Sequence, residues 1–116
     1  MESPSSCSED DKRRERDNLV RQVEGRLRQA IERDRSRIVN ENKPPQAELV
    51  EADFGRLQYE IALSETCAEA SGAVRYAWTV SYQEKNAAAE MIKKAVTVAQ
   101  TKQFRCVKSG ESWRCR

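Results

Sequence analysis

The amino-acid sequence predicts an α+β fold with a long N-terminal helix, an antiparallel β-sheet, a second helix and a C-terminal β-hairpin closed by a disulfide bond. Apolar residues near the N-terminus recur at helical spacing, and a central segment alternates strictly between apolar and other residues. The last residues can pair two cysteines across a tight turn. We expect a flexible tail over residues 1–10 and a single small domain over residues 11–116.

The first predicted element is a helix over residues 11–38. Its apolar residues follow a helical rhythm that gives one narrow buried face: Val20, Val23, Leu27, Ala30, Ile31 and Ile38. Ser8 and Asp11 have the spacing of a capping box at the start of this helix. Acidic and basic residues interleave over the rest of its surface, which is typical of a solvated face. The helix is also a candidate surface for a homodimer.

Residues 46–64 fit either a helix or a strand. The helical interpretation uses apolar spacings of three and four residues, whereas the strand interpretation uses strict alternation at Leu57, Tyr59, Ile61 and Leu63. Gly55 would cost a helix interior about 1 kcal/mol relative to alanine, and it suits a turn that precedes a strand. We prefer a strand over residues 56–64 and leave the helical alternative open.

The clearest strand is predicted over residues 73–83. Apolar side chains occupy every second position there, namely Val74, Tyr76, Trp78, Val80 and Tyr82. This strand needs a partner of similar length, which residues 56–64 would supply. A second helix is predicted over residues 87–101, where Asn86 would be the N-cap and the apolar face would contain Ala88, Met91, Ile92, Ala95 and Ala99.

A two-residue turn at Gly110 and Glu111 would set the register of a hairpin over residues 103–116. Glycine at the first turn position supplies the positive φ that a type II′ turn requires. Cys106 then faces Cys115 at a non-hydrogen-bonded site, where the Cα atoms come closest and a disulfide can form. One face of this ribbon carries Phe104, Cys106, Lys108, Trp113 and Cys115, and the other carries Arg105, Val107 and Arg114.

The chain has four cysteines, and pairing Cys106 with Cys115 leaves Cys7 to pair with Cys67. Two disulfides predict an oxidising compartment, either periplasmic or extracellular. The N-terminus lacks the apolar stretch of a signal peptide, so we expect the native signal peptide to be missing from this sequence. A free or lipid-anchored Cys7 remains an open alternative.

The sequence offers little for catalysis. It contains no histidine, no glycine-rich phosphate-binding loop and no cysteine spacing typical of a metal site. No apolar run approaches the length of a membrane-spanning helix. We therefore expect no enzymatic activity, no catalytic residues, no metal, no cofactor and no membrane span.

Charge is distributed unevenly along the chain, although the net charge is only +2. Residues 91–116 contain seven basic side chains and one acidic side chain, which predicts an acidic binding partner. The candidate partner-binding residues are Phe104, Arg105, Lys108, Trp113 and Arg114. If Phe104 and Trp113 pack inward, the hairpin presents its arginines to solvent; otherwise the two rings are exposed binding anchors.

These patterns favour a non-catalytic extracytoplasmic protein-binding domain of the inhibitor, immunity or secretion-accessory type. Its partner would be a protein with an acidic surface. The alternative is a cytosolic nucleic-acid-binding module, which would use the same basic C-terminal residues and keep four reduced cysteines. We prefer the protein-binding interpretation because the even number of cysteines and the geometry of the hairpin both indicate disulfides.

Overall fold

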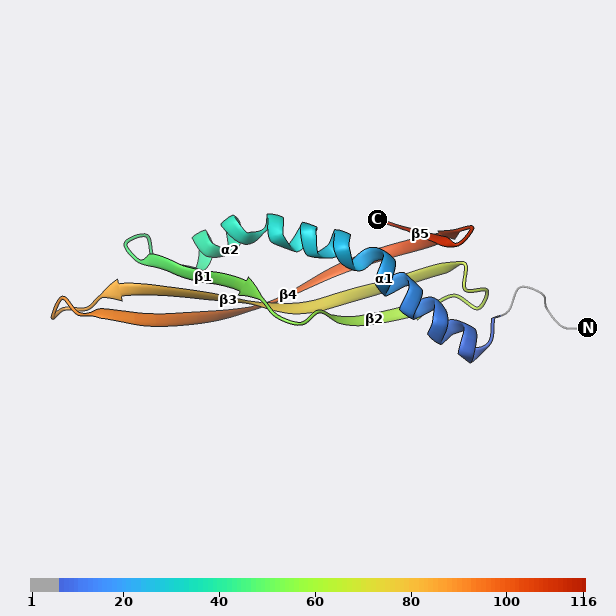
Figure 1. The fold of residues 1–116 in the computed structure, drawn as a ribbon, viewed down its shortest axis with the longest axis horizontal. Helices are drawn as coiled ribbons and strands as arrows, with labels where there is room; N and C mark the ends of the chain where they lie inside the picture. Colours follow the sequence, from blue (N-terminus) through green and yellow to red (C-terminus); the bar gives the residue numbers. More distant parts are fainter. Residues whose placement is uncertain (1–6) are drawn as a thin grey trace, which may run out of the picture. The chain divides into compact units, whose positions relative to one another are not determined.

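A computed structural model describes residues 7–116 of the chain, where two helices precede five strands (Figure 1). The elements are α1 (Glu9–Arg33), α2 (Arg35–Asn42), β1 (Glu48–Phe54), β2 (Gln58–Leu63), β3 (Glu69–Lys85), β4 (Met91–Ser109) and β5 (Ser112–Cys115). Within this described part, neither helix combines the length and the hydrophobicity that crossing a bilayer would require.

The strands belong to one sheet in the order β1-β3-β4-β5, and β2 also pairs with β3. β1 is antiparallel to β3, with a register that runs from Glu48 opposite Gln83 to Phe54 opposite Trp78. β4 and β5 form an antiparallel hairpin. β1, β2 and β4 therefore all depend on the 17-residue β3 for backbone pairing.

The described chain divides into two compact units, which we name the hairpin unit and the β1 unit. The hairpin unit contains residues 7–28, 58–74 and 102–116, and the β1 unit contains residues 29–57 and 75–101. α1, β3 and β4 contribute residues to both units. The expectation of a single domain over residues 11–116 stays a prediction.

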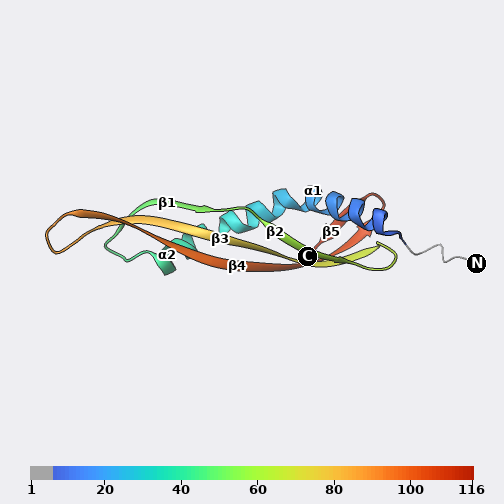
Figure 2. The same ribbon diagram turned by 90° about the horizontal axis from the view of Figure 1, so that it is seen from below.

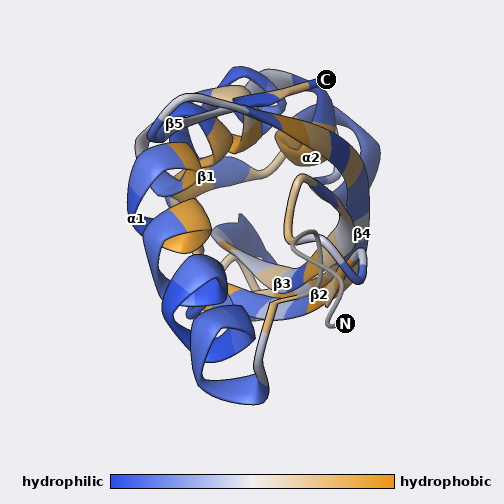
Figure 3. Ribbon diagram, turned by 90° about the vertical axis from the view of Figure 1, so that its right-hand side faces the viewer, coloured by the Kyte–Doolittle hydropathy of each residue, from blue (hydrophilic) through white to orange (hydrophobic). Residues whose placement is uncertain are grey.

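In the hairpin unit, one face of α1 packs against strand residues. Leu19 and Val23 of the helix are buried together with Ala70, Phe104, Cys106 and Trp113. Partly buried side chains complete this core: Leu27, Tyr59, Ile61, Leu63 and Cys115. Figure 3 shows the apolar residues of α1 on one side of the helix and hydrophilic residues around the rest. The amphipathic pattern of α1 thus accounts for the face that it buries.

In the β1 unit, the core is built around Trp78, which is fully buried. The Phe54 ring meets Trp78 edge-on, with a centroid distance of 5.1 Å and an interplanar angle of 66°. The guanidinium carbon of Arg35 lies 5.7 Å from the centroid of the Trp78 ring. Ile31 and Ile38 are also fully buried. Figure 2 shows β1 alongside the part of β3 that precedes the loop to β4.

The helix predicted over residues 11–38 is present, but the structure divides it into two helices. α1 begins earlier than predicted, at Glu9, and α2 begins at Arg35. Between them, the amide of Asp34 donates to the carbonyl oxygen of Ile31, three residues back, at 3.0 Å. This tighter turn interrupts the regular helical hydrogen-bond pattern.

The capping box at the start of α1 is confirmed. The amide of Asp11 donates to the Ser8 hydroxyl at 3.1 Å, and the amide of Ser8 donates to the Asp11 carboxylate at 3.2 Å. Of the flexible tail predicted over residues 1–10, residues 1–6 lie outside the described residues. Cys7 forms a disulfide and the last two residues of that range already belong to α1, so the predicted tail extends too far.

Both predicted strands are confirmed. Residues 56–64 contain β2, and residues 73–83 lie within the longer β3. The strand alternative for residues 46–64 holds, and this segment also contains β1, which the sequence analysis did not predict. The amide of Gly55, just after β1, donates to the carbonyl oxygen of Ala77 at 3.1 Å. Gly55 thus lies at the end of a strand, as its helix-breaking character indicates.

The helix predicted over residues 87–101 is wrong, because β4 begins at Met91 and continues through this segment. The Asn86 side chain does accept hydrogen bonds, but from the amides of Ala88 and Glu90, at 2.9 and 3.0 Å, in a tight turn. Three consecutive β-branched residues favour a strand here: Val96, Thr97 and Val98. Pairing with β3 outweighs the helix propensity of the alanines.

The C-terminal hairpin is confirmed in its register. Cys106 lies opposite Cys115, and Ser109 lies opposite Ser112. Gly110, in the turn, has a φ of 65°, which favours glycine over residues with a side chain. The hairpin is longer than predicted on one side, because β4 starts before residue 103.

Candidate functional site

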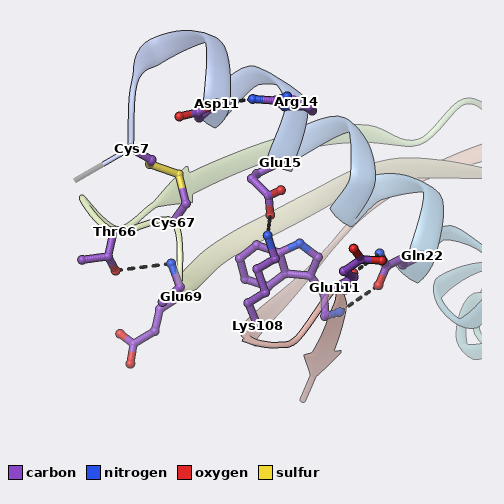
Figure 4. A network of polar contacts seen from close by, with 12 residues as sticks. Cys7, Asp11, Arg14, Glu15, Gln22, Thr66, Cys67, Glu69, Lys108 and Glu111 are labelled. Atoms are coloured by element: carbon purple, nitrogen blue, oxygen red, sulfur yellow. Dashed lines mark hydrogen bonds and ion pairs between the residues drawn. A yellow bond between two sulfur atoms is a disulfide. The ribbon is translucent and has the colours of Figure 1, made fainter. Parts of the chain in front are cut away.

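Both predicted disulfides are present, and they lie in the hairpin unit. Cys106 is bonded to Cys115 across the hairpin, and Cys7 is bonded to Cys67 in the loop that precedes β3 (Figure 4). The amide of Cys7 also donates to the carbonyl oxygen of Glu65 at 2.8 Å. All four cysteines are therefore paired, and a free Cys7 is not what the structure shows.

Gln22 of α1 fastens the turn of the hairpin to the helix. Its side-chain oxygen accepts a hydrogen bond from the amide of Trp113 at 2.7 Å, and its side-chain nitrogen donates to the carbonyl oxygen of Glu111 at 3.1 Å. One amide side chain thus satisfies a donor and an acceptor of the hairpin backbone. Gln22 was not among the predicted site residues, although its position three residues after Leu19 places it beside the buried face of the helix.

An ion pair also joins α1 to the hairpin. The Lys108 ammonium lies 2.7 Å from a Glu15 carboxylate oxygen, and these two side chains are 29% and 12% exposed (Figure 4). Glu15 lies four residues before Leu19, so it too belongs to the helix face that meets the strands. Lys108, predicted to bind a partner, is therefore engaged within the protein.

Phe104 and Trp113 are both buried, with only 6% and 5% of their surface exposed. They belong to the core with Cys106, as the inward-packing alternative predicted. As a result, the rings are not solvent-facing anchors, and Arg105 and Arg114 project from the opposite face of the ribbon.

This outward face of the hairpin is basic. Arg105 lies opposite Arg116, and the two residues exchange backbone hydrogen bonds of 3.2 and 2.8 Å. Arg114 lies opposite Val107, which is 56% exposed. We name the set of Arg105, Arg114 and Arg116 the arginine face. Arg116 was not among the predicted partner-binding residues, although its place directly after Cys115 gives it the same side as Arg114.

The arginine face borders two adjoining shallow hollows, of about 620 and 650 Å³. Both are lined by Ala62, Ser71, Arg105 and Arg116. The small residues Ala62 of β2 and Ser71 of β3 are exposed. Two acidic residues also belong to the lining, Glu69 in the first hollow and Glu60 in the second. Such a surface can accept side chains of a partner and pair with its carboxylates.

The ionisable groups with shifted pKa values lie elsewhere. Burial raises the pKa of Tyr59 above its ordinary value, and the nearby Glu24 carboxylate raises it further. Hydrogen bonds with Ser8, chiefly with its amide, lower the pKa of Asp11. Across residues 7–116, no group of three or more histidine, cysteine, aspartate or glutamate side chains is placed to hold a metal ion.

Comparisons with protein families, with curated proteins and with solved structures find no match for this chain. Its function must therefore be inferred from its own geometry and chemistry.

Proposed function

We propose that this protein is a non-catalytic protein-binding domain that acts in the periplasm or outside the cell, as an inhibitor, immunity protein or secretion accessory. The observation that carries the proposal is the arginine face on a disulfide-closed hairpin. Three exposed arginines lie on one side of a cross-linked ribbon, next to two shallow hollows. An acidic protein surface would complement this arrangement in charge.

Rigidity of the arginine face supports binding. The Cys106–Cys115 bond fixes the ribbon, and Gln22 and Glu15 fasten it to α1. A surface that is already ordered loses little conformational entropy when a partner binds, so more of the interaction free energy appears as affinity. Charged side chains at the exposed rim of a protein–protein interface mainly affect the association rate and the salt dependence of the affinity.

The disulfide-bonded state of the cysteines supports the proposed extracytoplasmic location. Two disulfides are consistent with an oxidising, extracytoplasmic environment. We expect the protein recovered from its native host compartment to show no free thiols on alkylation and mass spectrometry, and two bridges on peptide mapping. Four alkylated cysteines without prior reduction would contradict this placement.

Charge reversal tests the binding face. We expect Arg105→Glu with Arg114→Glu to weaken binding of the partner, captured from the native compartment and purified, and to flatten the salt dependence of its affinity. The matched control is Arg13→Glu with Arg26→Glu, which makes the same change in net charge at exposed positions of α1. Titration calorimetry at low and moderate salt would measure both effects.

Two results would contradict the proposal. Equal affinities of the wild type and of the Arg105→Glu, Arg114→Glu variant at low salt would exclude the arginine face. Binding of RNA or DNA at about 50 mM salt, with affinity that falls steeply as salt rises, would instead support the nucleic-acid alternative. That alternative has less support because Phe104 and Trp113, the aromatic rings nearest the arginines in sequence, are buried and offer no stacking surface.

A further inference from the structure

We propose that a second copy of this chain pairs with the open edge of β4, so that the two β4 strands run antiparallel with Thr97 opposite Thr97. The inference goes beyond the proposed function, because it concerns residues 93–101 of the β1 unit rather than the arginine face. Such a contact is isologous and would close a two-fold dimer through backbone hydrogen bonds.

The edge is open over most of β4. The neighbours of β4 in the sheet are β3 and β5, and β5 pairs with β4 only between Cys106 and Ser109. Within the described chain, the earlier part of β4 therefore has a strand neighbour on one side only. Its side chains are exposed or partly exposed throughout residues 91–103, and Met91 is 48% exposed.

The direction of the backbone groups follows from both ends of the strand. The amide of Lys108 donates to the carbonyl oxygen of Ala68, at the start of β3, and the amide of Asn86, just after β3, donates to the carbonyl oxygen of Glu90. At both ends of β4, the backbone groups of even-numbered residues therefore form hydrogen bonds toward β3. Because the direction alternates along a strand, the amides and carbonyls of the odd-numbered residues between Lys93 and Thr101 point toward the open edge.

The middle of this edge has none of the usual protection against pairing. Open edges are commonly blunted by proline, by a bulge or by charges within the strand. Residues 95–99 contain no proline, no glycine and no charge, and Lys93 and Lys94 lie before them. Alternation of partly buried and exposed positions continues without a break through this segment. These residues can therefore accept another strand.

The sequence of the edge complements itself. Residues 95–99 are a palindrome centred on Thr97: Ala95, Val96, Thr97, Val98 and Ala99. With Thr97 on the two-fold axis, each Val96 faces a Val98, and each Ala95 faces an Ala99. β-branched pairs across strands are favourable. This register also pairs odd-numbered residues with odd-numbered residues, as the direction of the backbone groups requires.

Charge selects this register over its neighbours. Centred on Thr97, the pairing places Lys94 opposite Gln100 and Lys93 opposite Thr101, so no like charges meet. Centred on Val98, it would place Lys94 opposite Lys102, which is unfavourable. Centred on Val96, it would place Lys94 opposite Val98 and replace the two Val96–Val98 pairs with a single Val96–Val96 pair.

A charge swap at the axis tests the proposal. We expect wild-type protein to sediment as a dimer, at twice the 13.3 kDa of the chain, when studied up to about 1 mM. Thr97→Lys and Thr97→Glu would each weaken the dimer at least about fivefold, since each places like charges opposite one another. An equimolar mixture of the two variants should recover the dimer. Thr79→Lys, an exposed change on the interior strand β3, is the matched control and should leave dimerisation unchanged.

Amide hydrogen exchange gives a second readout within one molecule. We expect the amides of Ala95, Thr97 and Ala99 to gain protection as protein concentration rises, whereas those of Val96 and Val98 stay protected at all concentrations. A wild-type protein that stays monomeric over the whole range would overturn the proposal. A dimer that persists in both the Thr97→Lys and the Thr97→Glu variant would also overturn it. The dimer contact would then lie elsewhere, for example on the helix predicted over residues 11–38. Neither result bears on the proposed function, which is tested separately by partner binding of the Arg105→Glu, Arg114→Glu variant.

Discussion

Gly72 shows how one residue shapes the hairpin unit. A Cβ atom at this position would lie 2.7 Å from the carbonyl oxygen of Glu60 and 2.8 Å from Cζ of Phe104. Neither distance is compatible with ordinary van der Waals contact. The absence of a side chain therefore lets β2 and the Phe104 ring approach β3 closely.

We expect Gly72→Ala to lower the free energy of unfolding by about 1–3 kcal/mol, the range for overpacking a well-filled core. Urea unfolding with the disulfides intact would measure the change. Gly25→Ala is the control, because a Cβ there meets nothing within 4 Å. That substitution should raise the stability of α1 by roughly 0.5–1 kcal/mol. Equal stability of Gly72→Ala and wild type would contradict the close approach.

Some residue contacts could have been predicted from the sequence and others could not. Glu15 lies four residues before Leu19 and Gln22 three residues after it, so helical spacing places both polar side chains beside the buried face, where they can meet strand residues. The identity of those partners, Lys108 and the turn of the hairpin, depends on how the helix meets strands far away in the sequence. Local periodicity carries no information on such pairings.

At the scale of elements, the contact between α1 and the hairpin depends on Gln22. We expect Gln22→Ala to lower the free energy of unfolding by about 1–3 kcal/mol, because the amide of Trp113 loses its acceptor in a partly buried place. Gln22→Glu keeps that acceptor and loses only the donor to Glu111, so it should cost less. Chemical denaturation of both variants would rank them. A larger loss for Gln22→Glu would contradict this assignment of the two hydrogen bonds.

The elements differ in how far the sequence predicts them. The hairpin register was predictable because the turn and the alternation are local, and Cys106 faces Cys115 as expected. β4 was not predicted before residue 103, since its alanines imitate a helical face over residues 87–101. Only the long β3 beside it, a partner outside that window, makes the strand the better structure.

For the whole molecule, the two disulfides should differ in their effect on stability. The Cys7–Cys67 bond closes a loop with a sequence separation of 60, against 9 for Cys106–Cys115. On the chain-entropy estimate, the longer loop contributes about 4 kcal/mol and the shorter about 2.7 kcal/mol. We expect Cys7→Ser with Cys67→Ser to lower the urea midpoint more than Cys106→Ser with Cys115→Ser. The reverse order would show that the hairpin bond mainly holds native contacts rather than restricting the unfolded chain.

The same two bonds determine how the molecule would respond to tension. If Cys7 and Cys115 were pulled apart, force would pass through the bridges, and the chain inside each covalent ring would not be stretched. Only the segment between Cys67 and Cys106 could lengthen, to about 130 Å instead of the roughly 360 Å that the reduced chain would reach. β3 and most of β4 form that segment. With both disulfides intact, the distance to which Cys7 and Cys115 can be pulled apart is therefore limited, and reduction of the disulfides would nearly triple it.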